Sequence, residues 1–440
     1  MSRITNVSTP LPGPKGAALL AEWHQYEANC VGYQAPVVWD HAQGCVVTDV
    51  DGNTYLDWTS GVLVTNVGHC HPHLVEAVRQ QAGRLLNNYE CPTAERISAA
   101  KMMVETTPAN LDRTFFMSTG SEATEAAMRV AKRYTGNFEI ISFTGGFHGR
   151  TYAAAAAGGL AGPKRQYGPI MPGVIKTLYP YCYRCPLGKT CDNCSMECFD
   201  LMESLVLASS TGSLAGLIIE PYQGAAGFIF PPEGFLPRLE AWARERGIIF
   251  ILDEVQSSYG RTGKMYAAEW EDLHPHLMSV GKGIGSGIPV SALMAEAEVI
   301  GALQPGEMSS TAGGNPVSSA AVIAVLEIIA KENLVENSRR LGEIMKARLL
   351  EIQQKCPYLG DVRGRGLIVG LEFVKDQQTK EPAPELIRQI IDRAAQAGVL
   401  CGSVGIYGNV LRVAPPLVIT EDELHESLDI MEEVLTNLSV

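Results

Sequence analysis

The chain has 440 residues, 46% of them hydrophobic and 19% charged, so it is long and apolar enough to build a core in more than one lobe. Its 48 acidic side chains outnumber 35 basic ones, and the formal net charge of −13 argues against nucleic acid as the main partner. The sequence contains no uncharged apolar run of about 18 residues and no apolar leader near the N-terminus, which predicts a cytoplasmic protein without a membrane partner.

Residues 1–60 are predicted to form an N-terminal arm and part of a small domain. Residues 10–14 are rich in proline and glycine, which is typical of an extended segment. Within residues 46–57, two short strand-like runs lie on either side of Asp51-Gly52. Because Asp-Gly favours a tight turn, this segment predicts two short strands joined by a hairpin.

Residues 61–316 are predicted to form a large domain. Short apolar runs alternate there with segments of helix length, and the clearest runs are residues 115–117, 140–143 and 217–219. This alternation is typical of an α/β domain with a mainly parallel sheet.

Residues 317–440 are predicted to form a smaller α+β domain. One long helix rich in Ala, Ile and Leu begins after residue 316. A glycine-rich turn at residues 364–366, a strand and a final amphipathic helix follow.

Lys282 and Asp253 are the strongest pair of candidate functional residues. Lys282 follows the apolar run 277–280 and has a glycine on each side, while Asp253 ends the apolar run 248–252. Pyridoxal phosphate needs a lysine amine that condenses with its aldehyde and an acid that keeps its pyridine nitrogen protonated. The pair therefore predicts this cofactor, whereas Lys282 taken alone would be read as a solvated turn residue.

A candidate phosphate site follows the predicted strand 115–117. Gly120 and Ser121 open a helix whose small and apolar residues recur near the helical period. Free N–H groups and the helix dipole at such an N-terminus favour a phosphate. The alternative is an ordinary helix cap formed by Thr119 or Ser121.

Two further segments could contact the ring of the cofactor. Phe147, in the run Phe147-His148-Gly149-Arg150, can stack on the ring, or it can simply pack in the core. Gln256 lies three residues beyond Asp253 and could reach the phenolic oxygen of the ring, or it could form a structural polar pair at the strand end.

Together these segments resemble class III aminotransferases, a pyridoxal-phosphate family with fold type I, the aspartate aminotransferase fold. The resemblance covers roughly residues 35–435, and it is specific because many short motifs occur in the family's order and spacing. These motifs are Gly68-His69-Cys70-His71-Pro72, Ser121-Glu122-Ala123, Phe147-His148-Gly149, Glu220-Pro221, Leu252-Asp253-Glu254-Val255-Gln256, Gly260-Arg261-Thr262-Gly263, Lys282-Gly283, Gly313-Gly314-Asn315-Pro316, and Arg412 before Pro415-Pro416.

The resemblance implies how the cofactor ring is held. Lys282 would be the Schiff-base lysine and would also move the proton between the substrate Cα and the cofactor. Asp253 would bind the pyridine nitrogen and Gln256 the ring oxygen, and Phe147 and His148 would belong to the same cofactor site.

The resemblance also implies how the phosphate is held. Gly120 and Ser121 would bind it within one chain, and Thr311 of the neighbouring subunit would complete the site. The active unit would then be a homodimer whose two active sites lie at the subunit interface.

Four residues bear on the substrate. Arg412 would bind an α-carboxylate as a bidentate pair. Arg150 matches an arginine that binds the distal carboxylate in 4-aminobutyrate aminotransferases, and Val62 matches an apolar residue where dialkylglycine decarboxylases carry glutamine. Ala225 departs from the pattern, because those aminotransferases carry a glutamate there that pairs with the α-carboxylate arginine. An arginine without that partner favours α-amino acids over pure ω-amines.

The sequence thus predicts an aminotransferase that moves an amino group from a 4-aminobutyrate-like or α-amino acid to a 2-oxo acid such as 2-oxoglutarate or pyruvate. One alternative is an amino-acid racemase or epimerase of the same family, because both reactions begin by removing the Cα proton. A second alternative is a metal-binding interaction protein that has kept the fold without turnover.

A cysteine-rich segment remains outside this scheme. Cys182, Cys185, Cys191 and Cys194 form two C-x2-C pairs separated by five residues, and Cys198 follows. Four thiolates at such spacing could bind zinc or an iron–sulfur cluster. The alternative is a loop whose cysteines pack or stay reduced without metal.

Overall fold

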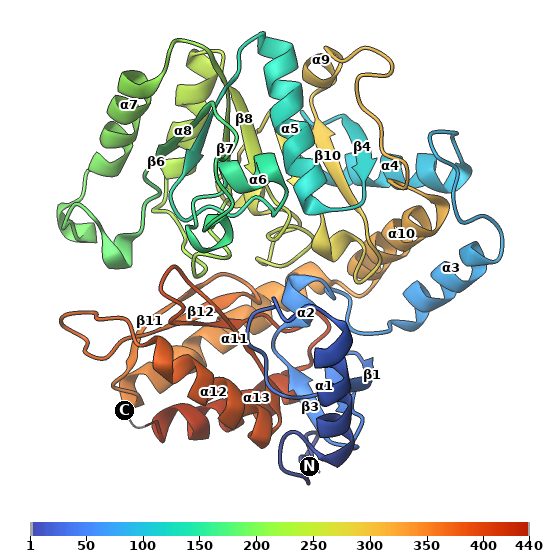
Figure 1. Ribbon diagram of the computed structural model, residues 1–440, viewed down its shortest axis with the longest axis vertical. Coiled ribbons are helices and arrows are strands. Elements are labelled where there is room, and N and C mark those ends of the chain that lie inside the picture. Colours follow the sequence, from blue (N-terminus) through green and yellow to red (C-terminus); the bar gives the residue numbers. More distant parts are fainter. Residues whose placement is uncertain (1–2, 439–440) are drawn as a thin grey trace.

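The computed structural model describes residues 3–438, apart from the side chain of Cys191. One half of the molecule is built around a seven-stranded sheet, and the other half contains both chain ends and two four-stranded sheets (Figure 1). Within the described residues, no helix combines the length and apolar character needed to cross a membrane.

The seven-stranded sheet has the order β4-β10-β9-β8-β7-β5-β6. Only β10 runs antiparallel to its neighbours, and the other paired strands are parallel, which confirms the predicted α/β fold with a mainly parallel sheet. Its strands are β4 (Arg113–Met117), β5 (Glu139–Phe143), β6 (Val174–Thr177), β7 (Leu214–Ile219), β8 (Ile249–Asp253), β9 (Leu277–Val280) and β10 (Ser291–Ala295).

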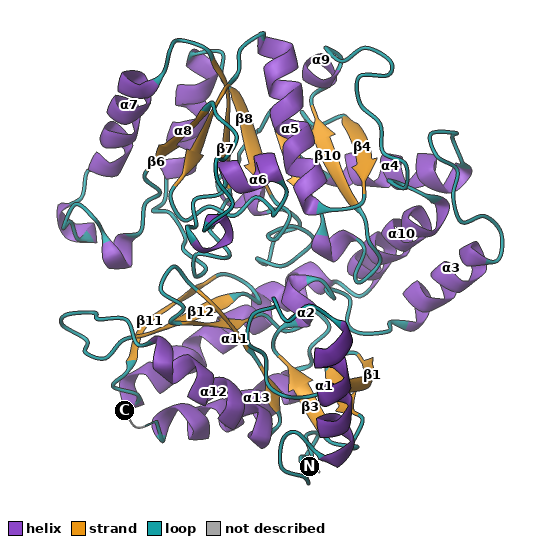
Figure 2. Cartoon of the chain, in the orientation of Figure 1, coloured by secondary structure: helices purple, strands orange, loops and turns teal. Residues whose placement is uncertain are grey.

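Helices cover both faces of this sheet (Figure 2). Alternate residues of a strand face opposite ways, so Ile251 packs with the buried alanines of α5 (Gly120–Thr135), whereas Phe250 and Leu252 belong to the cluster that contains α8 (Phe235–Glu245). The remaining helices of this half are α3 (Pro72–Ala82), α4 (Ala94–Thr106), α6 (Tyr152–Ala157), α7 (Glu197–Ser209), α9 (Ala297–Ile300) and α10 (Pro316–Lys331).

The start of α5 is fixed by a capping box. The Thr119 side chain accepts a hydrogen bond from the Glu122 N–H, and the Glu122 side chain accepts from the Thr119 N–H. The capping alternative is therefore correct for Thr119. The box directs the first turn of α5, which contains Gly120 and Ser121, toward the end of the sheet where β8 finishes.

Both chain ends build the second half of the molecule. The predicted hairpin within residues 46–57 is confirmed, and its second strand pairs in parallel with β13, which follows α12. The first sheet contains β1 (Trp39–Gln43), β2 (Val46–Asp49), β3 (Thr54–Asp57) and β13 (Val399–Leu400). The second contains β11 (Leu359–Gly364), β12 (Val369–Phe373), β15 (Val410–Val413) and β14 (Gly402–Val404).

The single long helix predicted after residue 316 is instead two helices, α10 and α11 (Leu334–Lys355). Asn333 separates them with a φ of 52°, a left-handed conformation that asparagine tolerates and that breaks the helical path. The other helices of this half are α1 (Pro14–Tyr26), α2 (Ser60–Leu63), α12 (Pro384–Ala397) and α13 (Glu421–Thr436). Domain boundaries near residues 60 and 316 stay a prediction.

A fully buried arginine joins the two halves. Nη1 of Arg261, in the loop after β8, donates to the carbonyl oxygens of Leu367 at 3.0 Å and Pro415 at 2.6 Å. Its Nη2 donates to Oδ1 of Asn66 at 2.8 Å. Burial lowers the pKa of Arg261 to about 10, so the guanidinium stays charged at neutral pH. One side chain thus supplies donors to acceptors from three separate segments.

We predict that Arg261→Met destabilises the protein by about 3 kcal/mol or more, because three buried acceptors lose their donor. The urea midpoint, followed by tryptophan fluorescence, measures the change. Arg340→Met is the matched control, since Arg340 forms an exposed ion pair with Glu421, and its midpoint should stay near that of the wild type. Equal midpoints for both variants would refute the structural role of Arg261.

Candidate active site

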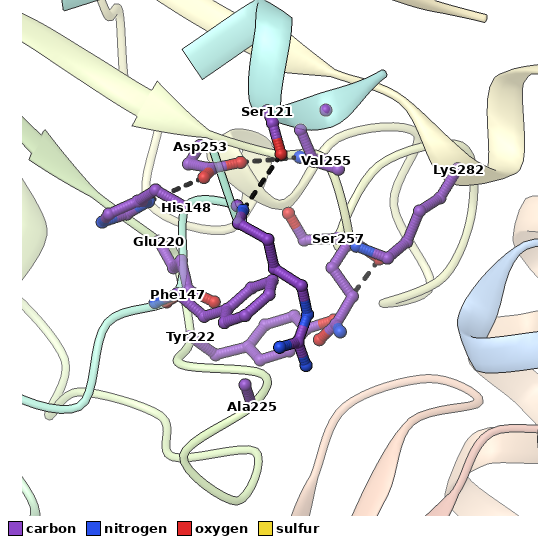
Figure 3. A pocket seen from close by; sticks show the side chains of 14 residues that line it. Ser121, Phe147, His148, Glu220, Tyr222, Ala225, Asp253, Val255, Ser257 and Lys282 are labelled. Carbon is purple, nitrogen blue, oxygen red and sulfur yellow. Dashed lines mark hydrogen bonds and ion pairs between the residues drawn. The ribbon is translucent and has the colours of Figure 1, made fainter. Parts of the chain in front are cut away.

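A cavity of about 290 Å³ lies where the parallel strands end. Its walls come from the first turn of α5, the loops that follow β5, β7 and β8, and the turn after β9. Ligands of open α/β sheets bind at the carboxyl ends of the strands, and this cavity lies at that end of the sheet. Figure 3 shows Ser121, Asp253 and Lys282 entering the cavity from different sides, with Ala225 at the end opposite Ser121.

Lys282 lies in the short turn Lys282–Ile284 directly after β9. Its φ of 45° is in the left-handed region, an uncommon conformation for a residue with a side chain. Burial lowers the pKa of its amine, although the charges of Asp253 and Glu220 oppose that effect. The amine has no hydrogen bond or ion pair within the described part of the chain, so it is free to act as a nucleophile once it is deprotonated.

Asp253 is held by a histidine that the sequence linked only to the cofactor. Nδ1 of His148 lies 2.7 Å from Oδ2 of Asp253, and both side chains are buried. The other carboxylate oxygen accepts from the Val255 N–H at 3.1 Å. His148 therefore fixes the direction in which Asp253 presents its carboxylate. The sequence gives no sign of this pair, because the two residues are 105 positions apart.

Glu220 is a further cavity residue to which the sequence assigned no role. Its two carboxylate oxygens accept from the Phe147 N–H at 2.8 Å and from the Gly224 N–H at 2.9 Å. Burial raises its pKa to about 7, while the nearby His148 acts in the opposite direction. Glu220 thereby ties together the loops that follow β5 and β7. Glu220 comes just after β7, and Asp253 lies at the end of β8. This shared position at a strand end could have identified Glu220 from the sequence.

The start of α5 has the shape of an anion site. A Cβ added to Gly120 would lie 2.7 Å from Cγ1 of Val255, so a larger residue does not fit between helix and loop. Oγ of Ser121 accepts from the Arg150 N–H at 3.2 Å, and Gly149 passes so close that a Cβ there would clash with Ser121. These contacts bring N–H groups, a hydroxyl and a helix N-terminus together, as a bound phosphate requires.

Gln256 supplies a second feature that fits a polar ring ligand. It lines the cavity, and its Oε1 is buried without a hydrogen-bond partner in the described structure. The side chain packs directly on Gly224, where an added Cβ would lie only 1.8 Å from Oε1. With the amine of Lys282, the carboxylate of Asp253 and the anion site, this unsatisfied amide fits pyridoxal phosphate. Phe147 and His148 line the same cavity.

The predicted substrate residues are distributed unevenly. Arg150 and Ala225 line the cavity, and the Arg150 guanidinium lies 5.8 Å from the centre of the Phe147 ring. Val62 and Thr311 are exposed in the single chain and do not line the cavity. Val62, in α2, has a φ of 69°, which is strained for a β-branched residue.

Arg412, on β15, is not among the residues that line the cavity and is only 5% exposed. Its Nε has no partner, and no described residue forms an ion pair or side-chain hydrogen bond with its guanidinium. Burial lowers its pKa, and its charge in turn contributes to the lowered pKa of Lys282. The two cations are therefore close enough to interact, and Arg412 has no carboxylate partner of its own.

The cysteine-rich segment does not form a metal centre among the described side chains. No three His, Cys, Asp or Glu side chains there are grouped so that they could hold an ion. Cys182, Cys185 and Cys194 are described, whereas the side chain of Cys191 lies outside the described part. The Met196 N–H donates to Sγ of Cys194 at 3.4 Å. The metal site stays a prediction.

We predict a pH dependence that originates at Glu220. A carboxyl group with its folded pKa raised from 4.5 to about 7 contributes stability below pH 4.5, and this contribution is lost as the pH rises through 7. The loss reaches at most about 3 kcal/mol, from the size of the pKa shift. Thermal unfolding of the cofactor-free protein between pH 4.5 and 8 measures it.

Glu220→Gln is the comparison for that experiment. Because glutamine does not titrate, any cost of the substitution is an offset that does not change with pH. The difference in stability between the variant and the wild type should therefore grow in favour of the variant as the pH rises to 7. Parallel pH profiles would show that Glu220 is not the source.

Comparison with known proteins gives consistent matches over nearly the whole chain. Residues 29–435 match the sequence model of the family described as aminotransferase class-III. An isoleucine 2-epimerase from Lentilactobacillus buchneri is 37% identical, over 96% of this chain and 95% of that protein. A 4-aminobutyrate aminotransferase from Mycobacterium tuberculosis is 36% identical, over 98% of each chain. The crystal structure of a Bacillus anthracis aminotransferase is 30% identical, with a TM-score of 0.89, covering 96% of this chain and 99% of that one.

Proposed function

Because this chain belongs to the class III aminotransferase family and is thus a pyridoxal-phosphate-dependent aminotransferase of fold type I, we propose that its amino donor is an α-amino acid bound through Arg412. Family membership supports the enzyme over an interaction protein without turnover. The choice between α-amino acids and 4-aminobutyrate rests on one observation, the buried guanidinium of Arg412 without a carboxylate partner.

A buried, unpaired guanidinium is costly, and an incoming carboxylate offsets that cost. Ala225 lines the cavity and stands where the enzymes that this chain resembles carry a glutamate. In those enzymes the glutamate is the partner of this arginine. A methyl group cannot neutralise Arg412. The positive charge therefore remains available to an α-carboxylate, and it disfavours a donor that brings no negative charge to this position.

The residues around the cavity divide the work of the reaction. Bound pyridoxal phosphate supplies an electron sink that stabilises negative charge at the donor Cα. Lys282 would remove the Cα proton and deliver it to the cofactor, since its amine is the base of the cavity that has no hydrogen bond among the described residues. Asp253, oriented by His148, would hold the pyridine nitrogen in its protonated form. Gln256 would bind the ring oxygen, and Phe147 would cover the ring face.

The phosphate would be held at the start of α5 by Gly120 and Ser121. Thr311 would complete this site from a second copy of the chain, which makes the active unit a homodimer. Its exposure in the single chain supports that proposal, because a buried threonine could not be offered to a partner. Val62 would approach the substrate from α2 in the same assembly.

The amino acceptor would be a 2-oxo acid such as 2-oxoglutarate or pyruvate. Arg150 lies at the exposed rim of the cavity and has no ion pair in the described structure. It could bind the distal carboxylate of a dicarboxylic acceptor while Arg412 binds the α-carboxylate. Two arginines that are separately available suit an acceptor with two carboxylates.

Racemisation is the second candidate function, because an isoleucine 2-epimerase, an alanine/serine racemase and a leucine/methionine racemase are among the similar proteins. Moving a proton across both faces of Cα requires a second free base opposite Lys282. Asp253 and His148 are bonded to each other, and both oxygens of Glu220 accept backbone hydrogen bonds. No further unbonded base lines the described cavity, and this supports transamination.

We predict that L-α-amino acids, mixed with the holoenzyme without an acceptor, bleach the visible absorption of the cofactor and yield a stoichiometric amount of oxo acid. 4-Aminobutyrate should bleach it at least about tenfold more slowly, the cost of one unfavourable charge interaction. Bleaching by 4-aminobutyrate alone would overturn the choice of donor. Loss of optical rotation without oxo acid would establish the racemase instead.

We predict that Ala225→Glu shifts the preference toward 4-aminobutyrate by about tenfold or more in the ratio of kcat/KM values, because a carboxylate can then pair with Arg412. Ala225→Gln is the matched control, since it adds the same volume without a charge. If both variants change the ratio equally, size rather than charge determines the preference.

A zinc or iron–sulfur site at Cys182, Cys185, Cys191 and Cys194 is a separate proposal. It is supported by the spacing of the two C-x2-C pairs and by the N–H···S contact at Cys194. Elemental analysis of protein purified without chelators tests it. Less than about 0.1 metal ion per chain, far below the single ion that four thiolates hold, would rule it out.

A further inference from the structure

Residues 224–228 form a short loop, here termed the substrate loop, that presents Ala225 to the cavity. A segment of the other half of the molecule grips its backbone. The Gly405 N–H donates to the Ala225 carbonyl at 2.9 Å, and the Ile406 N–H donates to the Ala226 carbonyl at 3.1 Å. The substrate loop is thus part of the large-sheet half by sequence but is held by the small-sheet half.

Arg363, on β11, makes the strongest contact with the substrate loop. Its Nε and Nη2 donate to the Gly227 carbonyl at 2.9 and 2.6 Å, and Nε also donates to the Phe228 carbonyl at 3.1 Å. Gly227 has a φ of 123°, and a Cβ there would lie 3.0 Å from Nη2 of Arg363. A glycine is therefore needed at this position both for the backbone conformation and for the approach of the guanidinium.

Glu372, on β12, provides the counter-charge for Arg363. It is fully buried, and its Oε2 lies 2.7 Å from Nη1 of Arg363, which also pairs with Asp361 at 2.6 Å. Burial alone would raise the pKa of Glu372, but its ion pairs and hydrogen bonds bring the pKa below the ordinary value. Glu372 consequently stays ionised inside the protein and fixes one edge of the Arg363 guanidinium.

Two further partners of Glu372 come from the start of the cysteine-rich segment. A third, Asn409, donates from its Nδ2 at 3.5 Å. The Tyr181 hydroxyl and Nε of Arg184 both donate to the Glu372 carboxylate. The Arg363 guanidinium lies 5.4 Å from the centre of the Tyr181 ring. Arg184 in turn lies 5.3 Å from the ring of Tyr407, next to the two N–H groups that grip the substrate loop. Tyr181 and Arg184 of this segment thus contact Glu372, Arg363 and Tyr407.

We propose that Arg363 is a positioning residue for the substrate loop, and that Tyr181 and Arg184 form a clamp that holds Arg363 through Glu372. This assigns a role to the Tyr-Cys-Tyr-Arg run that depends on its tyrosine and arginine and not on its cysteines. The inference deepens the proposed function, because the loop it positions is the one that carries Ala225.

The position of the substrate loop affects both ligands of the site. Gly224 packs against Gln256 so tightly that no Cβ fits between them, and a shift of the loop must therefore move the Gln256 amide. Ala225 is the next residue, and its side chain is the one that the loop presents to the substrate. Loosening the clamp should weaken donor binding more than it slows the chemical step, because Lys282 and Asp253 lie on other segments.

Hydrogen–deuterium exchange of the holoenzyme, read in the peptide that covers residues 222–230, tests the proposal directly. Tyr181→Phe keeps the ring and removes two hydrogen bonds of the hydroxyl, one to Glu372 and one from Nη2 of Arg363 at 3.4 Å. It should speed exchange in that peptide by about tenfold. Arg363→Met should have a larger effect. Both variants should raise KM for the amino donor several-fold while kcat changes by less than about twofold. Unchanged exchange in Tyr181→Phe would overturn the proposal, even if Arg363→Met fails to fold.

Two controls separate this clamp from other roles. Arg348→Met removes a triply ion-paired arginine of α11 that does not contact the substrate loop, and exchange in residues 222–230 should stay at the wild-type rate. The double variant Cys185→Ser, Cys194→Ser should also leave it unchanged. If the cysteine variant speeds exchange as much as Tyr181→Phe does, the cysteines hold the loop and the proposal is wrong.

The readout also separates this proposal from the proposed function. Exchange in the substrate loop does not depend on which amino acid is the donor. Faster exchange in Tyr181→Phe would support the clamp even if the titrations showed 4-aminobutyrate to be the donor. Conversely, α-amino acid specificity with unchanged exchange would reject the clamp alone.

Discussion

In the proposed function, the specificity of this site would depend on the desolvated charge of Arg412. On β15 the guanidinium is almost inaccessible to water and forms no ion pair among the described residues, although the charge of Asp57 acts on it. A charge in that state is costly to the fold, and the cost falls when a ligand brings a carboxylate. Its effect on the pKa of Lys282 shows that the same charge is felt at the reacting amine. If Arg412 binds the substrate as proposed, substrate binding and the protonation of Lys282 would be coupled electrostatically.

In the proposed function, the residues for chemistry and the residues for specificity would come from different halves of the molecule. Lys282, Asp253 and the anion site at α5 all belong to the ends of the seven-stranded sheet, which fixes them relative to one another. Arg412 and Arg363 belong to the small sheet β11-β12-β15-β14. The substrate loop is anchored by the small-sheet half but packs on Gln256 of the large-sheet half. Its position therefore depends on how the two halves are placed relative to each other. Such an arrangement allows the donor preference to change without altering the lysine or its neighbours.

Much of this organisation could be predicted from the sequence, because the chemistry lies at strand ends. Parallel strands bring their carboxyl ends to one edge, so Asp253 after one apolar run and Lys282 after another had to converge. The pairing of His148 with Asp253 could not be predicted, because it depends on the order in which β5, β7 and β8 lie in the sheet. Arg261 and Arg363 were missed for the same reason, since their acceptors are backbone carbonyls more than 100 residues away. The break at Asn333 was missed because the residues around it, Lys331-Glu332-Asn333, include neither glycine nor proline, the usual signals of a helix end.

Similar proteins that carry different names show that this fold does not by itself decide the reaction. An isoleucine 2-epimerase and a 4-aminobutyrate aminotransferase are almost equally similar to this chain, at 37% and 36% identity. The decision must therefore lie in the few groups that can exchange a proton at Cα. Here the hydrogen bonds of Glu220 to two backbone N–H groups make it a brace between loops and unsuited to act as a free base, even though its pKa is close to neutral. We propose that Lys282, the cavity amine without a hydrogen bond among the described residues, would carry a proton between Cα and the cofactor on one face, and that arrangement suits amino transfer.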